Sequence, residues 1–161
     1  MTLSRRFLCI GMTAALCATI ADTSSAASQL SQLVGAWALV SETHTSNGTT
    51  SEPFGSHPIG IAIYDRSGHF STQRMREDLP KFAANSKNGG TDAENKAVVQ
   101  GIMTLFGTFT VDEKSRTRLL HIAGSSYPNI IGTDLKETMM FKGDLMTIVN
   151  PVSTLVWKRL K

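Results

Sequence analysis

The sequence predicts an all-β protein, an eight-stranded antiparallel up-and-down barrel with one short helix between strands 3 and 4. Three observations predict this class. Apolar and polar residues alternate with a period of two over most of the chain. Turn-forming residues such as Asn47-Gly48 separate the alternating runs. The first and last runs both carry a tryptophan, and pairing of these two strands would remove the exposed edges of the sheet.

The first three strands are expected at residues 34–44, 57–65 and 69–76. The second has isoleucines at every other position from Ile59 to Ile63, and "DRSG" turns the chain into the third. The alternation then stops from Glu77 to Gly90. Acidic residues followed by apolar residues at helical spacing predict a helix over 92–104, capped by Thr91 or Asp92.

Alternation resumes in five further strands, at residues 105–113, 117–124, 133–141, 145–150 and 153–160. Short turns join most of them, which is typical of an up-and-down barrel. Eight strands enclose an interior just large enough for side chains or one small ligand. The segment 77–104 is the largest insertion between strands, so it is a candidate lid over the open mouth.

Residues 1–27 predict a cleaved signal peptide, which leaves residues 28–161 as one barrel domain. The segment has two early arginines, an apolar middle and small residues before the expected cleavage point. Its apolar run of about 14 residues is shorter than the roughly 20 needed to cross a bilayer, which disfavours a retained anchor. We therefore expect a periplasmic or secreted protein, exported either by the general route or by the twin-arginine route that "SRRFLC" resembles.

Composition narrows the classes of function. The expected mature domain has 14 basic and 12 acidic side chains, a net charge of +2, and no basic block, so nucleic acid is a poor candidate partner. Both cysteines lie in the predicted signal peptide, which excludes disulfides and thiol catalysis from the mature domain. No histidine pair has metal-ligand spacing and no glycine-rich loop enters a helix, so we expect no metal and no cofactor.

The two ends of the domain carry complementary motifs. Gly35 and Trp37 lie on the first strand, and Trp157 and Arg159 lie on the last. Closure of the barrel would bring them together, with an arginine against an indole and a glycine allowing close approach. We expect these four residues to close one end of the barrel.

These motifs resemble those of the lipocalins and the wider calycin superfamily. Longer blocks, including "EPFGSHPIGIAIYDRSGHFSTQRMREDLPKFA", "LHIAGSSYPNIIGTD" and "LVWKRL", resemble the bacterial and fungal lipocalin-like domain family and cover most of residues 33–160 in order. The resemblance implies an eight-stranded barrel with one internal cavity and a small-molecule pocket. Some related barrels are cyclases or isomerases, so the fold does not exclude catalysis.

Histidine 121, on the fifth strand, is the candidate catalytic residue if the protein is an enzyme. It would act as a general acid or base near neutral pH, and a histidine at this position is typical of the resembling family. The structural alternative is a polar residue on a half-buried strand. Glu137 stands where the family pattern leads us to expect arginine, and it could pair with His121 if both faced inward.

Polar residues on the third strand and after the fifth are candidates for orienting a ligand. On the third strand we expect Gln73 and Met75 to face inward, with Ser71 and His69. For Arg76 the resemblance implies one of two roles: it binds a ligand carboxylate or, as we favour, it anchors the loop to Asp78. The candidate ligand-binding residues are Tyr64, Gln73, Met75, Arg76, Phe109, His121, Ser125 and Asn129. Turn formation is the alternative role for Ser125 and Asn129.

Three classes of function remain open. The first is an exported, non-enzymatic carrier of a small apolar or amphipathic molecule. The second is an isomerase or cyclase that uses the same cavity, with His121 as base and Arg76 or Tyr64 stabilising charge. The third is an envelope protein with a filled barrel whose outer face binds another protein. Convergent polar groups in the cavity would favour the second class, and a filled interior with an exposed apolar patch the third.

Overall fold

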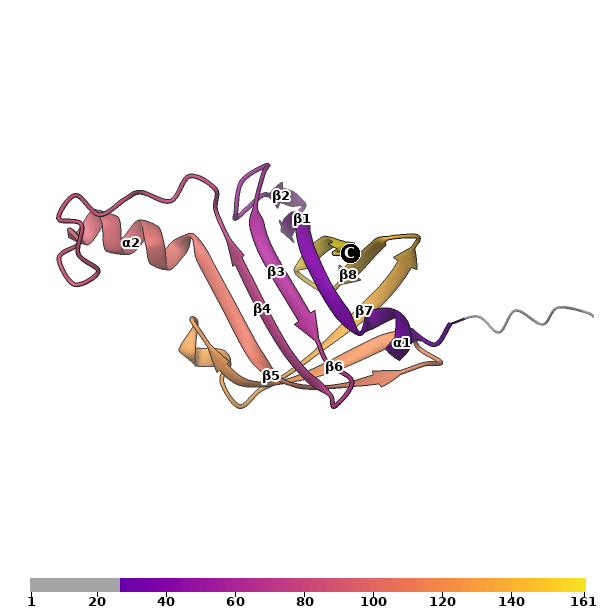
Figure 1. Ribbon diagram of the computed structural model, residues 1–161. Helices are drawn as coiled ribbons and strands as arrows, with labels where there is room; N and C mark the ends of the chain where they lie inside the picture. Colours follow the sequence, from indigo (N-terminus) through magenta and orange to yellow (C-terminus); the bar gives the residue numbers. More distant parts are fainter. Residues whose placement is uncertain (1–26) are drawn as a thin grey trace, which may run out of the picture.

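The computed structural model describes residues 27–161 (Figure 1), so the predicted signal peptide lies outside the described residues except for Ala27. Helices and strands follow one another along this part of the chain in the order α1 (Gln29–Leu33), β1 (Gly35–Ser46), β2 (Thr49–Ser51), β3 (Ile59–Tyr64), β4 (His69–Met75), α2 (Asp92–Gln100), β5 (Ile102–Asp112), β6 (Thr117–Ser125), the 3-10 turn η1 (Pro128–Ile130), β7 (Asp134–Lys142), β8 (Leu145–Val149) and β9 (Ser153–Arg159).

Eight antiparallel strands, β1 and β3 to β9, form a closed barrel, as predicted. Each pairs with its neighbour in the chain, and β1 also pairs with β9, which closes the sheet. The short strand β2 is additional and pairs with the end of β1 through the Asn47-Gly48 turn. Both turn residues have positive φ, 50° and 76°, as a tight two-residue hairpin requires. The helix α2 therefore lies between the fourth and fifth strands, not between the third and fourth as predicted.

The barrel has two different ends. The closed end carries the short turns 65–68, 113–116 and 143–144 together with α1. Ser28 caps α1 and the backbone N–H groups of Gln29 and Leu30 donate to Glu113 at 2.7 and 3.0 Å, which fastens α1 to the β5–β6 turn. The other end, here called the loop end, carries the longer connections 52–58, 76–91 and 126–133.

The hydrophobic core fills the barrel. Its buried members are Leu33, Trp37, Leu39, Ala62, Tyr64, Phe70, Leu105, Phe109, Leu120, Ile122, Met139, Met146, Ile148, Leu155 and Trp157. A bulge between Leu39 and Ser41 shifts the pairing of β1 with β9 by one residue. Because the bulge inserts one extra residue after Leu39, the alternation shifts by one position, and Glu42 rather than Ser41 becomes the next buried residue. The bulge thus places a carboxylate inside the barrel.

Helix α2 does not cover the barrel. Figure 1 shows it projecting to the left, away from β7 to β9, and none of its residues is buried. The predicted lid therefore does not cover the mouth of the barrel. The segment projects from the barrel beside the loop end. The helix also ends at Gln100 rather than residue 104, because residues 102–104 begin β5 and pair with β4. No helix within residues 27–161 is long and apolar enough to cross a membrane.

Candidate functional site

A first buried ion pair links β6 to β7 inside the barrel. Arg118 donates from Nε and Nη2 to Glu137 Oε2 at 2.9 and 2.7 Å. Its Nη1 donates to the hydroxyl of Tyr64, and Asn150 Nδ2 donates to Glu137 Oε1 at 3.0 Å. Every side-chain nitrogen of Arg118 and both oxygens of Glu137 thus have a protein partner. This pair is a completed structural network.

The environment of this network fixes its protonation. Burial alone would raise the pKa of Glu137, but Arg118 and the hydrogen bond from Asn150 hold that pKa below its ordinary value of 4.5. Burial alone would lower the pKa of Arg118, but Tyr64 and Glu137 raise it. Burial, only partly offset by Arg118, raises the pKa of Tyr64. At neutral pH the cluster therefore holds one cation, one anion and a neutral phenol.

A second ion pair lies nearer the loop end. Arg74 on β4 donates from Nη1 to Glu42 Oε1 at 2.7 Å, and the same oxygen lies 3.0 Å from His44 Nε2. Phe54, from the loop after β2, covers this pair, with its ring centroid 5.8 Å from the Arg74 guanidinium carbon. Glu42 is 2 % exposed and Arg74 9 % exposed, so both members of the pair are buried.

Between the two ion pairs lies an internal cavity of about 20 Å³, enough for one water molecule. The lining residues are Thr72, Arg74, Leu105, Arg118, Leu120, Glu137, Leu155 and Trp157. Three of them carry buried polar atoms that have no hydrogen-bond partner in the protein, Thr72 Oγ1, Arg74 Nε and Trp157 Nε1. Glu42 Oε2, beside Arg74, is a fourth such atom.

Unpartnered polar atoms of this kind are unusual in a folded interior. Each costs on the order of 1–3 kcal/mol if nothing satisfies it. In the pair of Arg118 and Glu137, every polar side-chain atom has a hydrogen-bond partner. In the pair of Arg74 and Glu42, Arg74 Nε and Glu42 Oε2 have none. The cavity therefore has the two features of a ligand site, an apolar wall and a few convergent polar groups.

The structure places two of the predicted ligand-binding residues, Tyr64 and Phe109, in the barrel interior, where their rings meet edge to face at 5.5 Å. It places Gln73 and Met75 on the outer side of β4, whose buried residues are Phe70, Thr72 and Arg74. The predicted inward face of this strand is therefore wrong. Both faces of β4 carry polar residues, and the pairing of Tyr64 with Phe70 across the β3–β4 hairpin decides which face is inside.

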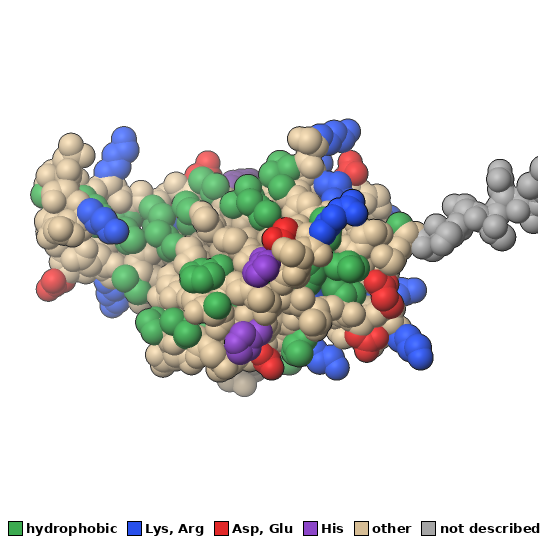
Figure 2. Space-filling view, turned by 60° about the horizontal axis from the view of Figure 1, so that its bottom comes forward, with side chains coloured by type: hydrophobic (Ala, Val, Ile, Leu, Met, Phe, Trp, Pro, Cys, Tyr) green, Lys and Arg blue, Asp and Glu red, His purple; other side chains and the backbone are tan. Residues whose placement is uncertain are grey.

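His121 faces outward from β6. Its side chain is 58 % exposed, and its Nδ1 lies 2.9 Å from Asp134 Oδ1 on β7. Figure 2 shows exposed histidines next to acidic side chains on one face of the molecule. The interior-facing residues of β6 are instead Arg118, Leu120 and Ile122. The expected couple between His121 and Glu137 does not form, because the two side chains lie on opposite faces of the sheet.

The remaining predicted ligand residues lie at the loop end. Arg76 donates from Nε and Nη2 to the two carboxylate oxygens of Asp78 at 2.8 and 2.7 Å, which is the geometry of the loop anchor that we favoured. Ser125 accepts from the backbone N–H of Tyr127 at 2.9 Å, which is turn chemistry. Asn129 is exposed in η1. None of these three lines the internal cavity.

The structure brings three of the four closure residues together. Arg159 is paired with Trp37 across β1 and β9, and its guanidinium carbon lies 4.1 Å from the centroid of the indole. It donates to the backbone oxygens of Val34, at 3.1 Å, and Gln32. Gly35 has a φ of 133°, which strains any residue with a side chain, and a Cβ there would lie 2.9 Å from Arg159 Nη1, so the position favours glycine. Trp157 lies elsewhere, in the wall of the internal cavity.

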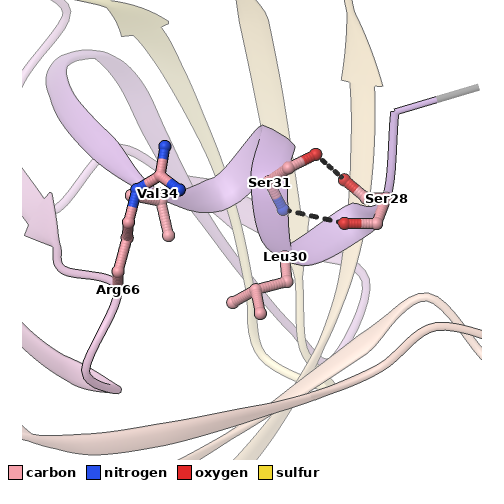
Figure 3. Close-up of a pocket in the computed structure, with 5 residues that line it drawn as sticks. All are labelled: Ser28, Leu30, Ser31, Val34 and Arg66. Carbon is pink, nitrogen blue, oxygen red and sulfur yellow. Dashed lines mark hydrogen bonds between the residues drawn. The ribbon is translucent and has the colours of Figure 1, made fainter.

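A larger hollow lies outside the barrel at the closed end, and Figure 3 shows its lining. It has a volume of about 290 Å³ and is lined by Ser28, Leu30, Ser31, Val34 and Arg66. The polar atoms of Ser28 and Ser31 bond to one another as the cap of α1. These groups are already satisfied and Arg66 is exposed, so this hollow lacks the unmet hydrogen-bonding capacity of the internal cavity.

Sequence reasoning missed the interior polar residues Glu42, Thr72, Arg74 and Arg118. A signal for Arg118 was available, because it shares a face with Leu120 and Ile122 and carries the charge opposite to Glu137 on the next strand. A comparable signal for Glu42 was absent. Its inward position depends on a bulge that the alternation of residues does not reveal.

Comparison with known proteins identifies one matching family and one similar protein of named function. Residues 34–159 match the profile of the lipocalin-like domain. The chain is also similar to the 4'-hydroxy-3'-methoxypropiophenone carrier protein ppsC of Aspergillus oryzae (strain ATCC 42149 / RIB 40), with 32% identity over 106 residues that cover 56% of this chain and 96% of that protein.

Among solved structures, an uncharacterized protein from Bacteroides eggerthii DSM 20697 aligns with a TM-score of 0.44 and 11% sequence identity, covering 79% of this chain and 98% of that one. The family match spans all the strands of the closed barrel and reaches from Val34 to Arg159. The chain belongs to the lipocalin-like domain family.

Proposed function

We propose that this protein is an exported carrier that binds one small, largely apolar molecule inside its barrel. The observation that carries the proposal is the internal cavity with its unpartnered polar atoms on Thr72, Arg74 and Trp157. Leu105, Leu120 and Leu155 line the rest of the cavity together with the paired Arg118 and Glu137, and the leucines favour an apolar ligand body. The carrier name of the Aspergillus oryzae relative supports the same class of function. The signal-like sequence of residues 1–27 supports export.

The cavity must enlarge to hold such a molecule. Pockets for small ligands usually occupy about 300–1,000 Å³, whereas this cavity occupies about 20 Å³. The satisfied network of Arg118, Glu137 and Tyr64 holds β6 to β7 and to β3. The less complete arrangement around Arg74 and Phe54 faces the loop end. Expansion therefore takes place toward the loop end, by displacement of Phe54.

Native mass spectrometry of the full chain purified from its own host tests the proposal. We expect a stoichiometric bound molecule, which extraction would identify. An apo mass, combined with no thermal stabilisation by a panel of lipids and aromatic metabolites, would contradict the carrier function. A bound ligand in excess stabilises the folded state in proportion to the logarithm of its concentration, so a genuine ligand gives a dose-dependent melting temperature.

Two neighbouring leucines on β6 give a matched pair of variants for this test. Leu120 is 1 % exposed and lines the cavity, whereas Leu119 is 41 % exposed on the outer face. Leu120→Phe should fill the cavity and abolish the bound mass, and Leu119→Phe should retain it. Circular dichroism melts of both variants check that the barrel remains folded, because overpacking costs about 1–3 kcal/mol. Equal retention of ligand by both variants would place the ligand outside the barrel.

A second candidate function is protein binding through the outer face. Ile63 and Phe106 are 47 % and 55 % exposed and flank Ser71 in register across β3, β4 and β5. Exposed apolar side chains on a sheet surface are typical of interaction sites. Size-exclusion chromatography with light scattering of Phe106→Ser, compared with the wild type, tests self-association through this face. An unchanged molar mass would oppose self-association there.

A further inference from the structure

The unpartnered atoms of the cavity define the chemistry of the ligand more closely, and this inference rests on the proposed carrier function. Trp157 Nε1 and Arg74 Nε each carry a hydrogen and can only donate it. Thr72 Oγ1 can donate or accept. These three residues line one cavity, and each is at least nine-tenths buried. A ligand atom that satisfies them must therefore be a hydrogen-bond acceptor.

The charges around the cavity distinguish between a neutral acceptor and an anion. Arg74 is neutralised by Glu42 at 2.7 Å, and Arg118 by Glu137 at 2.7 Å. A carboxylate in this cavity would add a buried negative charge with no free cation to balance it. A carbonyl oxygen accepts from the same donors without adding charge. The balance of charges therefore favours a neutral acceptor such as a carbonyl oxygen over an anion.

The two sides of the cavity also fix where that oxygen lies. Thr72 and Arg74 are two residues apart on the inner face of β4. Trp157 is on β9, which is paired with β1 and β8 rather than with β4. An oxygen that accepts from Trp157 and from a β4 donor would connect strands that have no ladder between them. We propose that the cavity between Thr72, Arg74 and Trp157 is a binding site for the carbonyl oxygen of a neutral ketone.

Isothermal titration with three small phenols tests this assignment. 4'-Hydroxypropiophenone carries a ketone, 4-propylphenol has the same phenol without the carbonyl, and 4-hydroxybenzoate carries a carboxylate. We expect the ketone to bind at least tenfold more tightly than either of the others. Equal binding of 4-propylphenol would overturn the carbonyl site while supporting the carrier function. Tighter binding of 4-hydroxybenzoate would overturn the preference for a neutral group.

Substitution of the hydrogen-bond donors of the cavity tests which of them are responsible for the preference for the ketone. Trp157→Phe removes the indole N–H and keeps an aromatic ring, so we expect a fivefold to tenfold weaker ketone affinity and unchanged affinity for 4-propylphenol. Trp37→Phe is the matched control, because Trp37 Nε1 already donates to Leu33 O at 2.9 Å and lies outside the cavity. Thr72→Val is a second, nearly isosteric variant that should also weaken ketone binding selectively.

The outcomes separate this inference from the function on which it rests. Loss of ketone selectivity in Trp157→Phe but not in Trp37→Phe supports the carbonyl site. Equal losses in both tryptophan variants, or unchanged ketone affinity in both Trp157→Phe and Thr72→Val, would overturn it. If the wild type binds none of the three phenols but a stoichiometric ligand is found by native mass spectrometry, the carrier function stands and the ketone assignment fails.

Discussion

At the scale of single residues, the barrel interior contains two ion pairs that differ in how many of their polar atoms have hydrogen-bond partners. Arg118 donates two hydrogen bonds to Glu137, and the pair has further partners in Tyr64 and Asn150. Removal of two charges from water costs several kcal/mol for each ion, and good geometry with satisfied hydrogen bonds is needed to offset that cost. This network meets the condition. Its role is therefore to hold β6, β7 and β3 in one arrangement around the cavity.

Glu137→Gln tests the structural role of this network. The folded-state pKa of Glu137 lies below 4.5. Its ionisation therefore stabilises the fold above the unfolded-state pKa, and that stability is lost as the pH falls through the folded pKa. Denaturant titrations from pH 7 to pH 3 should show this loss in the wild type. The variant should be less stable at pH 7 by about 3–5 kcal/mol, since Arg118 remains buried without its partner, and should show a flatter acid profile.

The control is Glu77→Gln, which changes an exposed glutamate in the loop after β4. It should leave both the stability at pH 7 and the acid profile close to those of the wild type. If Glu137→Gln behaves like Glu77→Gln, the buried ion pair contributes nothing to stability and the argument above is wrong.

Which residues face the interior could be predicted only in part at this scale. Phe109 follows from apolar alternation and lies inside. On β3 the alternating isoleucines do not mark the inner face, because Ile59 and Ile63 are exposed whereas Tyr64, on the other face, is buried. We expect Gln73 to face inward as a polar cavity residue, and His121 to do so if the protein is an enzyme, but both lie outside. Polar residues occur on both faces of β4 and β6, so composition cannot decide between the faces. Cross-strand register decides it, and register depends on contacts between residues far apart in the sequence.

At the scale of secondary-structure elements, helix α2 is attached to the barrel but is not part of its core. It has nine residues and none is buried. A helix of this length is marginal in water without tertiary packing. Its N-terminus compensates with a capping box, in which Thr91 Oγ1 accepts from Glu94 N at 3.3 Å and Glu94 Oε2 accepts from Thr91 N at 2.7 Å. Glu94 also accepts from Ala83 N at 2.9 Å, which fixes the preceding loop.

Thr91→Ala should therefore unfold α2 without unfolding the barrel. Loss of an N-cap costs about 1 kcal/mol, which is a large share of the stability of a solvent-exposed helix. Hydrogen exchange measured by mass spectrometry should show faster exchange over residues 92–100 and unchanged exchange in β1 and β9. Thr110→Ala, an exposed threonine on β5, is the control. A barrel that melts several degrees lower in Thr91→Ala than in the control would show that α2 supports the core after all.

The elements themselves could be predicted where local patterns were strong. The alternating runs gave all eight strands of the closed barrel, and Thr91 marked the start of α2. The end of α2 was misplaced because "IMTLF" contains apolar residues that fit either a helix or a strand. Two short elements, α1 and β2, were not foreseen. Helix α1 has five residues and is held by Glu113 from a distant turn, so its local sequence could not reveal it.

At the scale of the whole molecule, the two ends of the barrel differ in how they are closed. The closed end is sealed by backbone-bonded Arg159 against Trp37, beneath α1. Toward the loop end, Phe54 follows the short strand β2, is 6 % exposed and lies against the guanidinium of Arg74. On its outer side Phe54 borders a hollow of about 210 Å³ that is also lined by Arg76 and Asp78. Phe54 thus lines the outer hollow and contacts Arg74, which in turn lines the internal cavity.

Phe54→Ala should open the cavity to small solutes. We expect several-fold stronger quenching of Trp157 fluorescence by acrylamide, measured in a Trp37→Phe background where Trp157 is the one remaining tryptophan of the sequence. Trp157 is 1 % exposed, so its quenching in the parent protein should be close to the lower limit for a buried indole.

Phe82→Ala, in the loop before α2 and packed near Gly90 rather than over Arg74, is the control and should leave quenching unchanged. Quenching measured well below the melting temperature of each variant separates access from unfolding. If Phe54→Ala leaves Trp157 as protected as the control does, solutes reach the cavity by another route and Phe54 is part of a permanent seal.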